Sequence, residues 1–193
     1  MNATANTRDQ LLDYAQALIG SRGCNGFSYR DLAQHVGVKT SSIHYYFPCK
    51  DDLVREAIER YSEEATARVY AIDATLPAPD KLDRYAELLE GKVSAGKQLC
   101  IGGMMASDLA SLPESVQCVL RRFFLSMESW LEQVLKEGLA HGTLRICDEP
   151  GTVARAMFAA AQGSMLTARL FQEPCRIREA LESLYERQCD KAA

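Results

Sequence analysis

The chain has 193 residues, of which 47% are hydrophobic and 25% charged, and its formal net charge is −4. That length allows one large or two small domains with a real core, and the acidic balance argues against a protein that coats nucleic acid nonspecifically. No stretch of about 18 apolar residues indicates a membrane span. The N-terminal run MNATANTRDQ lacks the basic and apolar regions of a signal peptide, so we expect a cytoplasmic protein.

The seven cysteines are odd in number and include no C-x-x-C pair and no histidine at zinc spacing. Without a secretion signal, reduced thiols are the expectation, and we predict neither a structural metal nor a cofactor. The sequence also contains no G-x-S-x-G turn and no phosphate-binding loop, and it gives the three histidines no obvious partners. We therefore do not expect an enzyme.

A first helix is predicted from about residue 7 to residue 21, because Leu11, Ala15 and Leu18 repeat at helical spacing. Thr7 and Gln10 fit a capping box at its start. Gly20, Gly23 and Gly26 then indicate a turn between this helix and the next one.

The second helix is predicted to begin after Ser28, a preferred kind of N-cap residue, with Asp31 three positions later to complete a capping box. Gly37 follows its apolar stripe, where a left-handed C-cap residue is needed. Another short helix, about residues 40 to 46, comes after a turn of three to four residues and stops before Pro48. Two short helices joined by a glycine-containing turn indicate a helix-turn-helix unit.

The helix over residues 40 to 46 presents an unusual surface. Ile43 and Phe47 are four residues apart and can both face inward. The remaining side chains are mostly short, hydrogen-bonding or cationic, which are the types that contact phosphates and base edges. Residues 20 to 50 carry four cationic side chains and one acidic one, a local charge of +3. This pattern favours DNA contact over the alternative, a solvated helix without a partner.

The run GVKTSSIHYYFPCKDDL resembles the recognition helix and following turn of the tetracycline-repressor (TetR) family of bacterial transcription regulators. Its most recognisable parts are the aromatic pair before Phe47, the Pro48-X-Lys50 turn and Leu53. The resemblance is strong over about residues 7 to 60. Over the rest of the chain it extends only to length and helical pattern.

Two positions depart from the family pattern, because Lys39 and Cys49 stand where the family usually has a Ser or Thr cap. At Lys39 the chain gains a possible phosphate contact and loses a cap that is worth roughly 1 kcal/mol. Both departures affect where the helices start rather than which fold is expected.

The resemblance implies an all-α fold with an N-terminal three-helix helix-turn-helix DNA-binding domain, residues 1–55, and a C-terminal helical ligand-binding and dimerisation domain, residues 56–193. It implies a homodimeric repressor that places two recognition helices in successive major grooves of a palindromic double-stranded operator, about 34–36 Å apart. A small-molecule effector would favour a spacing that does not fit DNA. Thr40, Ser41, His44 and Tyr45 are expected to read bases. The other residues expected at the DNA are Ser28, Tyr29, Arg30, Lys39, Ser42 and Lys50.

A fourth helix is predicted from Lys50 to about Thr75, where LPAPDK with its two prolines breaks the pattern. The resemblance makes this helix the lever between the domains. The rest of the chain shows no alternating, strand-like run. The further predicted helices span about residues 79–96, 99–110, 113–141, 150–172 and 174–189.

A dimer interface is expected on the last two of these helices, which would form a four-helix bundle when doubled. Ala156, Ala160, Gly163 and Thr167 form a small-residue seam at helical spacing, and such a seam lets two helices approach closely. The last helix adds Ile177, Leu181 and Leu184. Packing inside one chain is the alternative, and the resemblance favours the dimer.

In the family, the helices of the C-terminal domain also enclose a ligand cavity. The residues predicted to line it here are Cys100, Met104, Met105, Phe123, Met127, Trp130, Phe158 and Met165. Because this set is apolar, aromatic and rich in sulfur, we expect a hydrophobic or aromatic effector. Phe123, Met127 and Trp130 repeat on one face of the helix over residues 113–141, and simple core packing is the alternative for them.

Cys100 offers a second hypothesis, a repressor that senses oxidants or electrophiles, since some family members do so through a cysteine near this position. A helix N-terminus lowers the pKa of a thiol and makes it more reactive. Against this, free cysteine is commonly a small buried hydrophobe. A third hypothesis is a helical binding module or enzyme that does not bind DNA.

Overall fold

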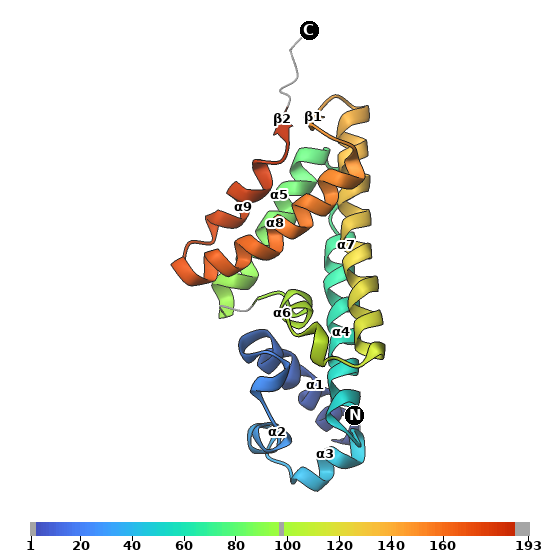
Figure 1. Cartoon of the computed structure of the whole chain (residues 1–193), viewed down its shortest axis with the longest axis vertical. Coiled ribbons are helices and arrows are strands. Elements are labelled where there is room, and N and C mark those ends of the chain that lie inside the picture. The colour runs from blue at the N-terminus through green and yellow to red at the C-terminus, as the bar shows by residue number, and fades with distance from the viewer. Residues whose placement is uncertain (1–2, 97–98, 188–193) are drawn as a thin grey trace. The chain divides into compact units, whose positions relative to one another are not determined.

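The computed structural model describes residues 3–96 and 99–187, and these residues form an almost entirely helical chain (Figure 1). The helices are α1 (Ala3–Arg22), α2 (Tyr29–Val36), α3 (Thr40–Tyr46), α4 (Lys50–Tyr70), α5 (Ala78–Gly96), α6 (Ile101–Ser107), α7 (Glu114–Ala140), α8 (Pro150–Phe171) and α9 (Cys175–Glu182). The predicted all-α fold is confirmed. Two short 3-10 turns, η1 (Cys24–Gly26) and η2 (Leu109–Ser111), and two strands, β1 (Leu144–Arg145) and β2 (Glu186–Arg187), complete the described elements.

The chain divides into two compact units. The first consists of Met1–Ala65 and Cys100–Phe123, and the second of Thr66–Leu99 and Phe124–Ala193. Both α4 and α7 contribute residues to each unit. The domain boundary expected between residues 55 and 56 stays a prediction.

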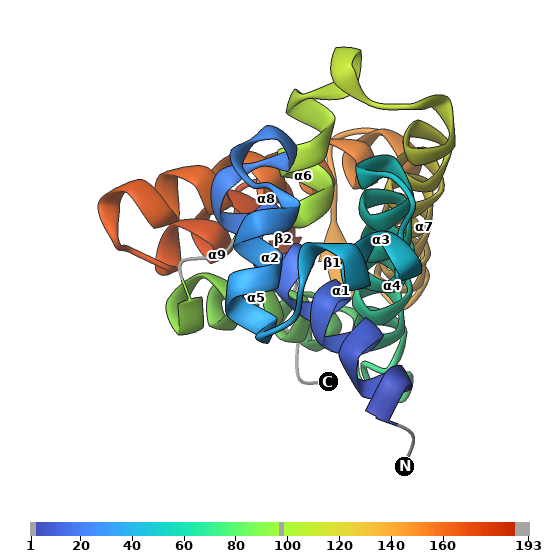
Figure 2. The same cartoon turned by 90° about the horizontal axis from the view of Figure 1, so that it is seen from below.

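The core of the first unit is formed by apolar side chains from α1, α2, α3 and α4. Leu11 and Ala15 of α1, Leu32 of α2 and Ile43 of α3 are fully buried, as is Leu53 of α4. Figure 2 looks onto this arrangement of α1, α2 and α3. Burial of these apolar side chains holds α2 and α3, which are too short to be stable by themselves.

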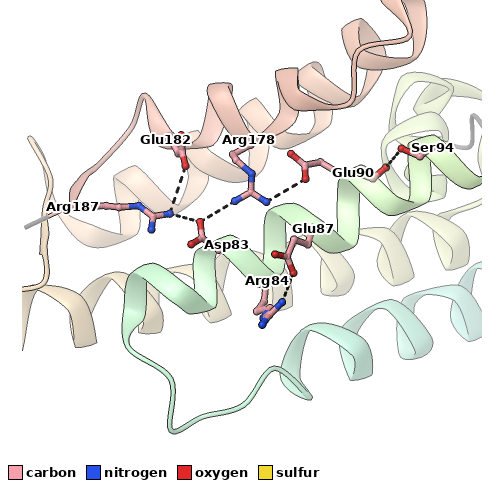
Figure 3. Close-up of polar contacts among 8 residues, drawn as sticks. All are labelled: Asp83, Arg84, Glu87, Glu90, Ser94, Arg178, Glu182 and Arg187. Atoms are coloured by element: carbon pink, nitrogen blue, oxygen red, sulfur yellow. Dashed lines mark hydrogen bonds and ion pairs between the residues drawn. The ribbon is translucent and has the colours of Figure 1, made fainter. Parts of the chain in front are cut away.

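In the second unit, α9 packs against α5 and α8, and charged side chains tie α9 to α5 (Figure 3). The Arg178 guanidinium on α9 lies 3.0 Å from the Asp83 carboxylate and 3.2 Å from the Glu90 carboxylate, both on α5. Asp83 also accepts a hydrogen bond from Arg187 of β2, which in turn pairs with Glu182. One carboxylate thus serves two arginines and fixes the end of the described chain on α5.

Several helix ends differ from the predictions. α1 begins at Ala3, so Thr7 lies inside the helix and the predicted Thr7 capping box is wrong. α4 ends at Tyr70 rather than near Thr75, because Asp73 draws the chain into a turn by accepting bonds from the Thr75 amide and hydroxyl, at 2.8 and 2.7 Å. The helix predicted over residues 99–110 is α6 followed by η2.

The largest difference concerns α9, which ends at Glu182 instead of about residue 189. Part of the predicted helix is β2, which pairs antiparallel with β1, with Leu144 opposite Arg187. Leu144 is buried and lies so close to Gly138 of α7 that a Cβ there would be 2.4 Å from a Leu144 methyl carbon. Glycine at position 138 therefore allows β1 to dock on α7. Among the described residues, no helix has the length and apolar character needed to cross a membrane.

Candidate nucleic-acid interface

The start of α2 is fixed by its capping box, as the sequence predicts. The Asp31 carboxylate accepts hydrogen bonds from the Ser28 amide and the Ser28 hydroxyl, both at 2.7 Å. These bonds lower the pKa of the Asp31 carboxyl, because they stabilise its charged form. Phe27 before the cap and Leu32 after it are both buried, which is the arrangement expected of a hydrophobic staple.

The turn between α2 and α3 also follows the prediction. Gly37 adopts the left-handed conformation, with φ 76° and ψ 31°, and its amide bonds to the Ala33 carbonyl oxygen at 3.0 Å. The Val38 amide bonds to the same oxygen at 3.1 Å. Since only glycine adopts this conformation without strain, the residue type at position 37 sets the angle at which α3 leaves α2.

Two apolar side chains fix α3 on the first unit, and most of the other side chains of the helix are exposed. Ile43 and Phe47 are fully buried, whereas the Tyr45 side chain is 80% exposed and touches the Tyr46 ring edge-on at 5.3 Å between centroids. Lys39 precedes the helix and makes no side-chain cap. The other predicted contacts on this face, Thr40, Ser41 and His44, are exposed, and Ser42 is half-buried. The face therefore offers hydroxyl, imidazole and phenol groups on a rigid base.

Of the predicted contacts at the start of α2, Ser28 and Arg30 are exposed, whereas Tyr29 is largely occupied inside the unit. Its hydroxyl donates to the Phe47 carbonyl oxygen at 2.9 Å, and its ring meets the His44 ring edge-on at 4.8 Å. Burial, reinforced by the neighbouring Cys49 and acidic side chains, raises the pKa of Tyr29 to about 12. Tyr29 thus joins the start of α2 to the end of α3.

Lys50, which is also expected at the DNA and would hold its backbone, is likewise bonded internally. Its ammonium donates to the Cys24 and Phe27 carbonyl oxygens, both at 2.7 Å, and lies 4.4 Å from the centre of the Phe27 ring. Cys49, just before it, is exposed, and its thiol donates to the Asp52 carboxylate at 3.0 Å. The Cys49 thiol therefore contacts the carboxylate three residues later, which is the position of the acidic residue in a capping box.

Sequence reasoning missed the polar contacts that fix α1 on α4. Arg8 pairs with Glu56 and lies over the Phe47 ring, 5.3 Å from its centre. Further along, the Gln16 side-chain amide donates to the Ala57 carbonyl oxygen at 3.1 Å. No short motif signals such contacts, since Arg8 and Glu56 are 48 residues apart and Gln16 and Ala57 are 41 apart. Through Phe47, the residue that follows α3, Arg8 also links α1 to the end of α3.

A second feature absent from the predictions is a hollow of about 340 Å³ between α1 and α2. Its walls include Gln10, Asp13 and Val36. Tyr14 and His35 line it as well, and their rings stack with centroids 3.4 Å apart. The hollow is open to solvent, and two of the side chains that line it, Tyr14 and His35, contact each other.

The residues predicted to line an effector cavity are divided between the units. Cys100, Met104, Met105 and Phe123 belong to the first unit, and Met127, Trp130, Phe158 and Met165 to the second. All of them are buried except Met104, which is half-buried. In the first unit the Tyr61 hydroxyl lies 3.4 Å from the Cys100 sulfur. This burial does not favour Cys100 as an exposed reactive thiol, and a shared cavity stays a prediction.

The predicted dimer residues also separate into two kinds. On α8, Ala156, Gly163 and Thr167 are exposed and Ala160 is half-buried. On α9, Ile177 and Leu181 are 0% and 2% exposed, and Leu184 is half-buried. Ile177 and Leu181 are therefore core residues of the second unit rather than part of its surface. Sequence reasoning instead missed Leu166 and Leu170, which are 55% and 74% exposed on α8.

The part of the chain that the structure describes contains no group of three or more His, Cys, Asp or Glu side chains placed to hold a metal ion. The exposed side chains of the candidate interface offer hydrogen bonding, cationic contact and aromatic stacking. These are the interactions that proteins use to bind nucleic acids.

Comparison with known proteins agrees with that chemistry. Residues 11–57 match the sequence model described as bacterial regulatory proteins, tetR family. A crystal structure of a TetR-family transcriptional regulator from Agrobacterium tumefaciens is 31% identical and covers 95% of this chain and 100% of that one, with a TM-score of 0.89. A TetR transcriptional regulator from Legionella pneumophila is also 31% identical, over 92% and 95% of the two chains, with a TM-score of 0.82.

Among curated proteins, the HTH-type transcriptional repressor KstR2 of Mycolicibacterium smegmatis is 27% identical over 143 residues. That match spans 73% of this chain and 69% of the repressor. The relatives named here are described as regulators of transcription.

The capping box predicts how the stability of α2 depends on pH. Because the pKa of Asp31 is lower in the folded chain than its ordinary value, its contribution to stability is present above about pH 4 and is lost as the pH falls through the lowered pKa. Asp31→Asn should unfold at lower urea concentration than the unaltered chain at pH 7, and the difference should shrink below about pH 4. A difference that is the same at both pH values would contradict this assignment.

Proposed function

The chain belongs to the TetR family of bacterial transcription regulators and is a DNA-binding regulator, and from this premise we propose that it works as a homodimeric repressor. In this proposal a small hydrophobic or aromatic effector releases the cytoplasmic dimer from a palindromic double-stranded operator. The observation that carries it is α3, whose exposed hydroxyl, imidazole and phenol groups stand on the fully buried Ile43 and Phe47.

Base reading is assigned to the outward face of α3, with Thr40, Ser41, His44 and Tyr45 as the readers. An α-helix fits the major groove, where each base pair presents a distinct pattern of donors and acceptors. Phosphate contact is assigned to Ser28, Arg30 and Lys39 on either side of that helix, and Ser42 and Tyr29 support the same surface. Cations at the edge of a reading helix fix its register on the duplex.

The first test is binding to duplex DNA from upstream of the chain's own gene. Tyr45→Ala should weaken binding roughly tenfold, on the order of the loss of one base contact, and leave the urea midpoint unchanged because the ring is 80% exposed. Leu109→Ala, which alters a half-exposed side chain of the first unit outside the helix-turn-helix, is the control and should bind normally. A titration by fluorescence anisotropy checks both variants.

If the unaltered chain bound no specific fragment in a genomic selection, the repressor proposal would fail. If Tyr45→Ala bound as tightly as the unaltered chain, the DNA surface would have to be assigned to another face.

The dimer is proposed to form through α8. Its exposed face carries small residues, Ala156 and Gly163, beside the large Leu166 and Leu170. An exposed apolar surface of this kind marks a contact with another protein, and small residues let two helices approach closely. In a twofold dimer the same face serves both protomers. α9 would support this contact from within each protomer, since its apolar residues are buried against α5 and α8.

Gly163→Arg tests the dimer. An added Cβ at Gly163 meets no atom within 4 Å, so the substitution should leave the protomer folded, and replacing a mid-helix glycine adds up to about 1 kcal/mol of helix propensity. The expected result in light scattering is a change from a dimer to a 21.4 kDa monomer, with loss of operator binding. Gly91→Arg is a matched control, because Gly91 is exposed on α5 with equally open space. Dissociation of both variants, or of neither, would contradict the proposed interface.

The effector is proposed to bind among the buried apolar residues of the C-terminal part of the chain. In the second unit, Trp130 packs against Tyr85 with ring centroids 5.6 Å apart, and the Phe158 ring meets Phe124 edge-on at 5.0 Å. Met127 and Met165 are buried in the same unit, and methionine adapts its shape to apolar ligands. Such an environment suits an apolar or aromatic compound better than a sugar or nucleotide.

Because Trp130 is the only tryptophan, its fluorescence reports on this region directly. Neutral aromatic compounds that release the chain from DNA should change the Trp130 emission with the same half-saturating concentration, whereas sugars should change neither. DNA release without any change in emission would place the effector elsewhere. A change in emission without release would leave the compound a ligand that favours neither state of the dimer.

A further inference from the structure

Lys50 begins α4, yet its ammonium turns back toward the segment that leads into α2. Its nitrogen bonds to the carbonyl oxygens of Cys24 and Phe27, at 2.7 Å each, and lies 4.4 Å from the centre of the Phe27 ring. The cation is therefore bound by the two ends of the four-residue segment Cys24–Phe27. Phe27 is the residue directly before Ser28, the N-cap of α2.

These contacts indicate that the Lys50 side chain has a structural role. A cation at the N-terminus of a helix is poorly placed with respect to the helix dipole, so acceptors outside α4 have to hold it. Backbone carbonyl groups in a turn need partners as well, and hydrogen bonds from a charged donor are stronger than neutral ones. Lys50 thus joins the first turn of α4 to the backbone that fixes the start of α2.

We propose that Lys50 is a positioning residue for DNA binding, which holds the Cys24–Phe27 segment on α4 and so places the uncharged contact Ser28, and that it is not a phosphate contact. This inference rests on the proposed DNA-binding surface. It assigns opposite roles to two lysines of the same helix-turn-helix region, Lys50 and Lys39.

The difference between the two lysines is visible in their surroundings. Two of the three N–H donors of Lys50 are used internally, and the residue is half-buried. Lys39 is exposed, and within the described ranges no hydrogen bond or ion pair engages its ammonium. Lys39 is therefore free to approach a phosphate, whereas Lys50 would have to leave its carbonyl partners to do so.

Salt dependence separates the two roles. Each phosphate contact that is removed lowers the slope of log affinity against log salt by about 0.9, because one fewer set of counterions is released. Lys50→Met should weaken binding to the upstream duplex about tenfold, the effect of losing a charge-assisted bond, and keep the slope of the unaltered chain. Lys39→Met, the matched control, should lower the slope by about 0.9 for each protomer on the DNA.

Two results in this experiment would overturn the proposal. A slope lowered by Lys50→Met as much as by Lys39→Met would make Lys50 a phosphate contact. Full affinity of folded Lys50→Met, measured well below its melting temperature, would make Lys50 a residue that only stabilises the fold. Should the methionine variant fail to fold, Lys50→Gln retains a neutral donor and loses the charge, so the same slopes decide.

A second measurement needs no DNA. Amide hydrogen exchange over residues 24–28 should be faster in Lys50→Met than in the unaltered chain and unchanged in Lys39→Met, since Lys50, unlike Lys39, bonds to that segment. Unchanged exchange in both variants would overturn the proposal. If the unaltered chain bound no DNA but Lys50→Met still freed the segment, the failure would belong to the proposed function and not to the contact itself.

Discussion

α3 has seven residues, and a helix of that length does not persist in water because so few hydrogen bonds do not offset the cost of nucleation. It exists here because Ile43 and Phe47 are fully buried beneath it. Phe47 is held further by Arg8 over its ring and by the Tyr29 hydroxyl on its carbonyl oxygen. The exposed face of α3 is therefore ordered before any DNA arrives, and little conformational entropy remains to be lost on binding.

Unlike α3, α8 is a long helix, and its exposed face is largely apolar. With 22 residues, α8 is long enough to form on the apolar surface that it buries within the second unit, through residues such as Met157 and Ala161. Its exposed side is nevertheless apolar, with Leu170 74% and Leu166 55% exposed. Surface of this kind is costly in a monomer and useful in an assembly. The protomer can therefore fold by itself, although the proposed function requires a dimer.

Features decided by neighbouring residues could be predicted from the sequence, and features decided by distant ones could not. The Ser28–Asp31 capping box and the left-handed Gly37 follow from local chemistry. The end of α9 does not, because β2 pairs with Leu144 about forty residues earlier and Arg187 bonds to Asp83. The bonds of Lys50 could not be predicted from the sequence either. The Pro48-X-Lys50 turn draws attention to the residue, but only the fold shows that its ammonium bonds to the Cys24 and Phe27 carbonyl oxygens.

The polar contacts of α4 bear on how the proposed effector would act on the proposed DNA-binding surface. α4 is bonded to the segment before α2 through Lys50, to α1 through the Gln16 bond to Ala57, and to Asp13 through Arg60 at 2.7 Å. Apolar packing tolerates small sliding, whereas hydrogen bonds weaken steeply with distance and angle. A shift of α4 that broke all three of these polar contacts would require more free energy than a shift that carried α1 and α2 along with α4. Under the proposed mechanism, displacement of α4 therefore moves the helix-turn-helix as one body.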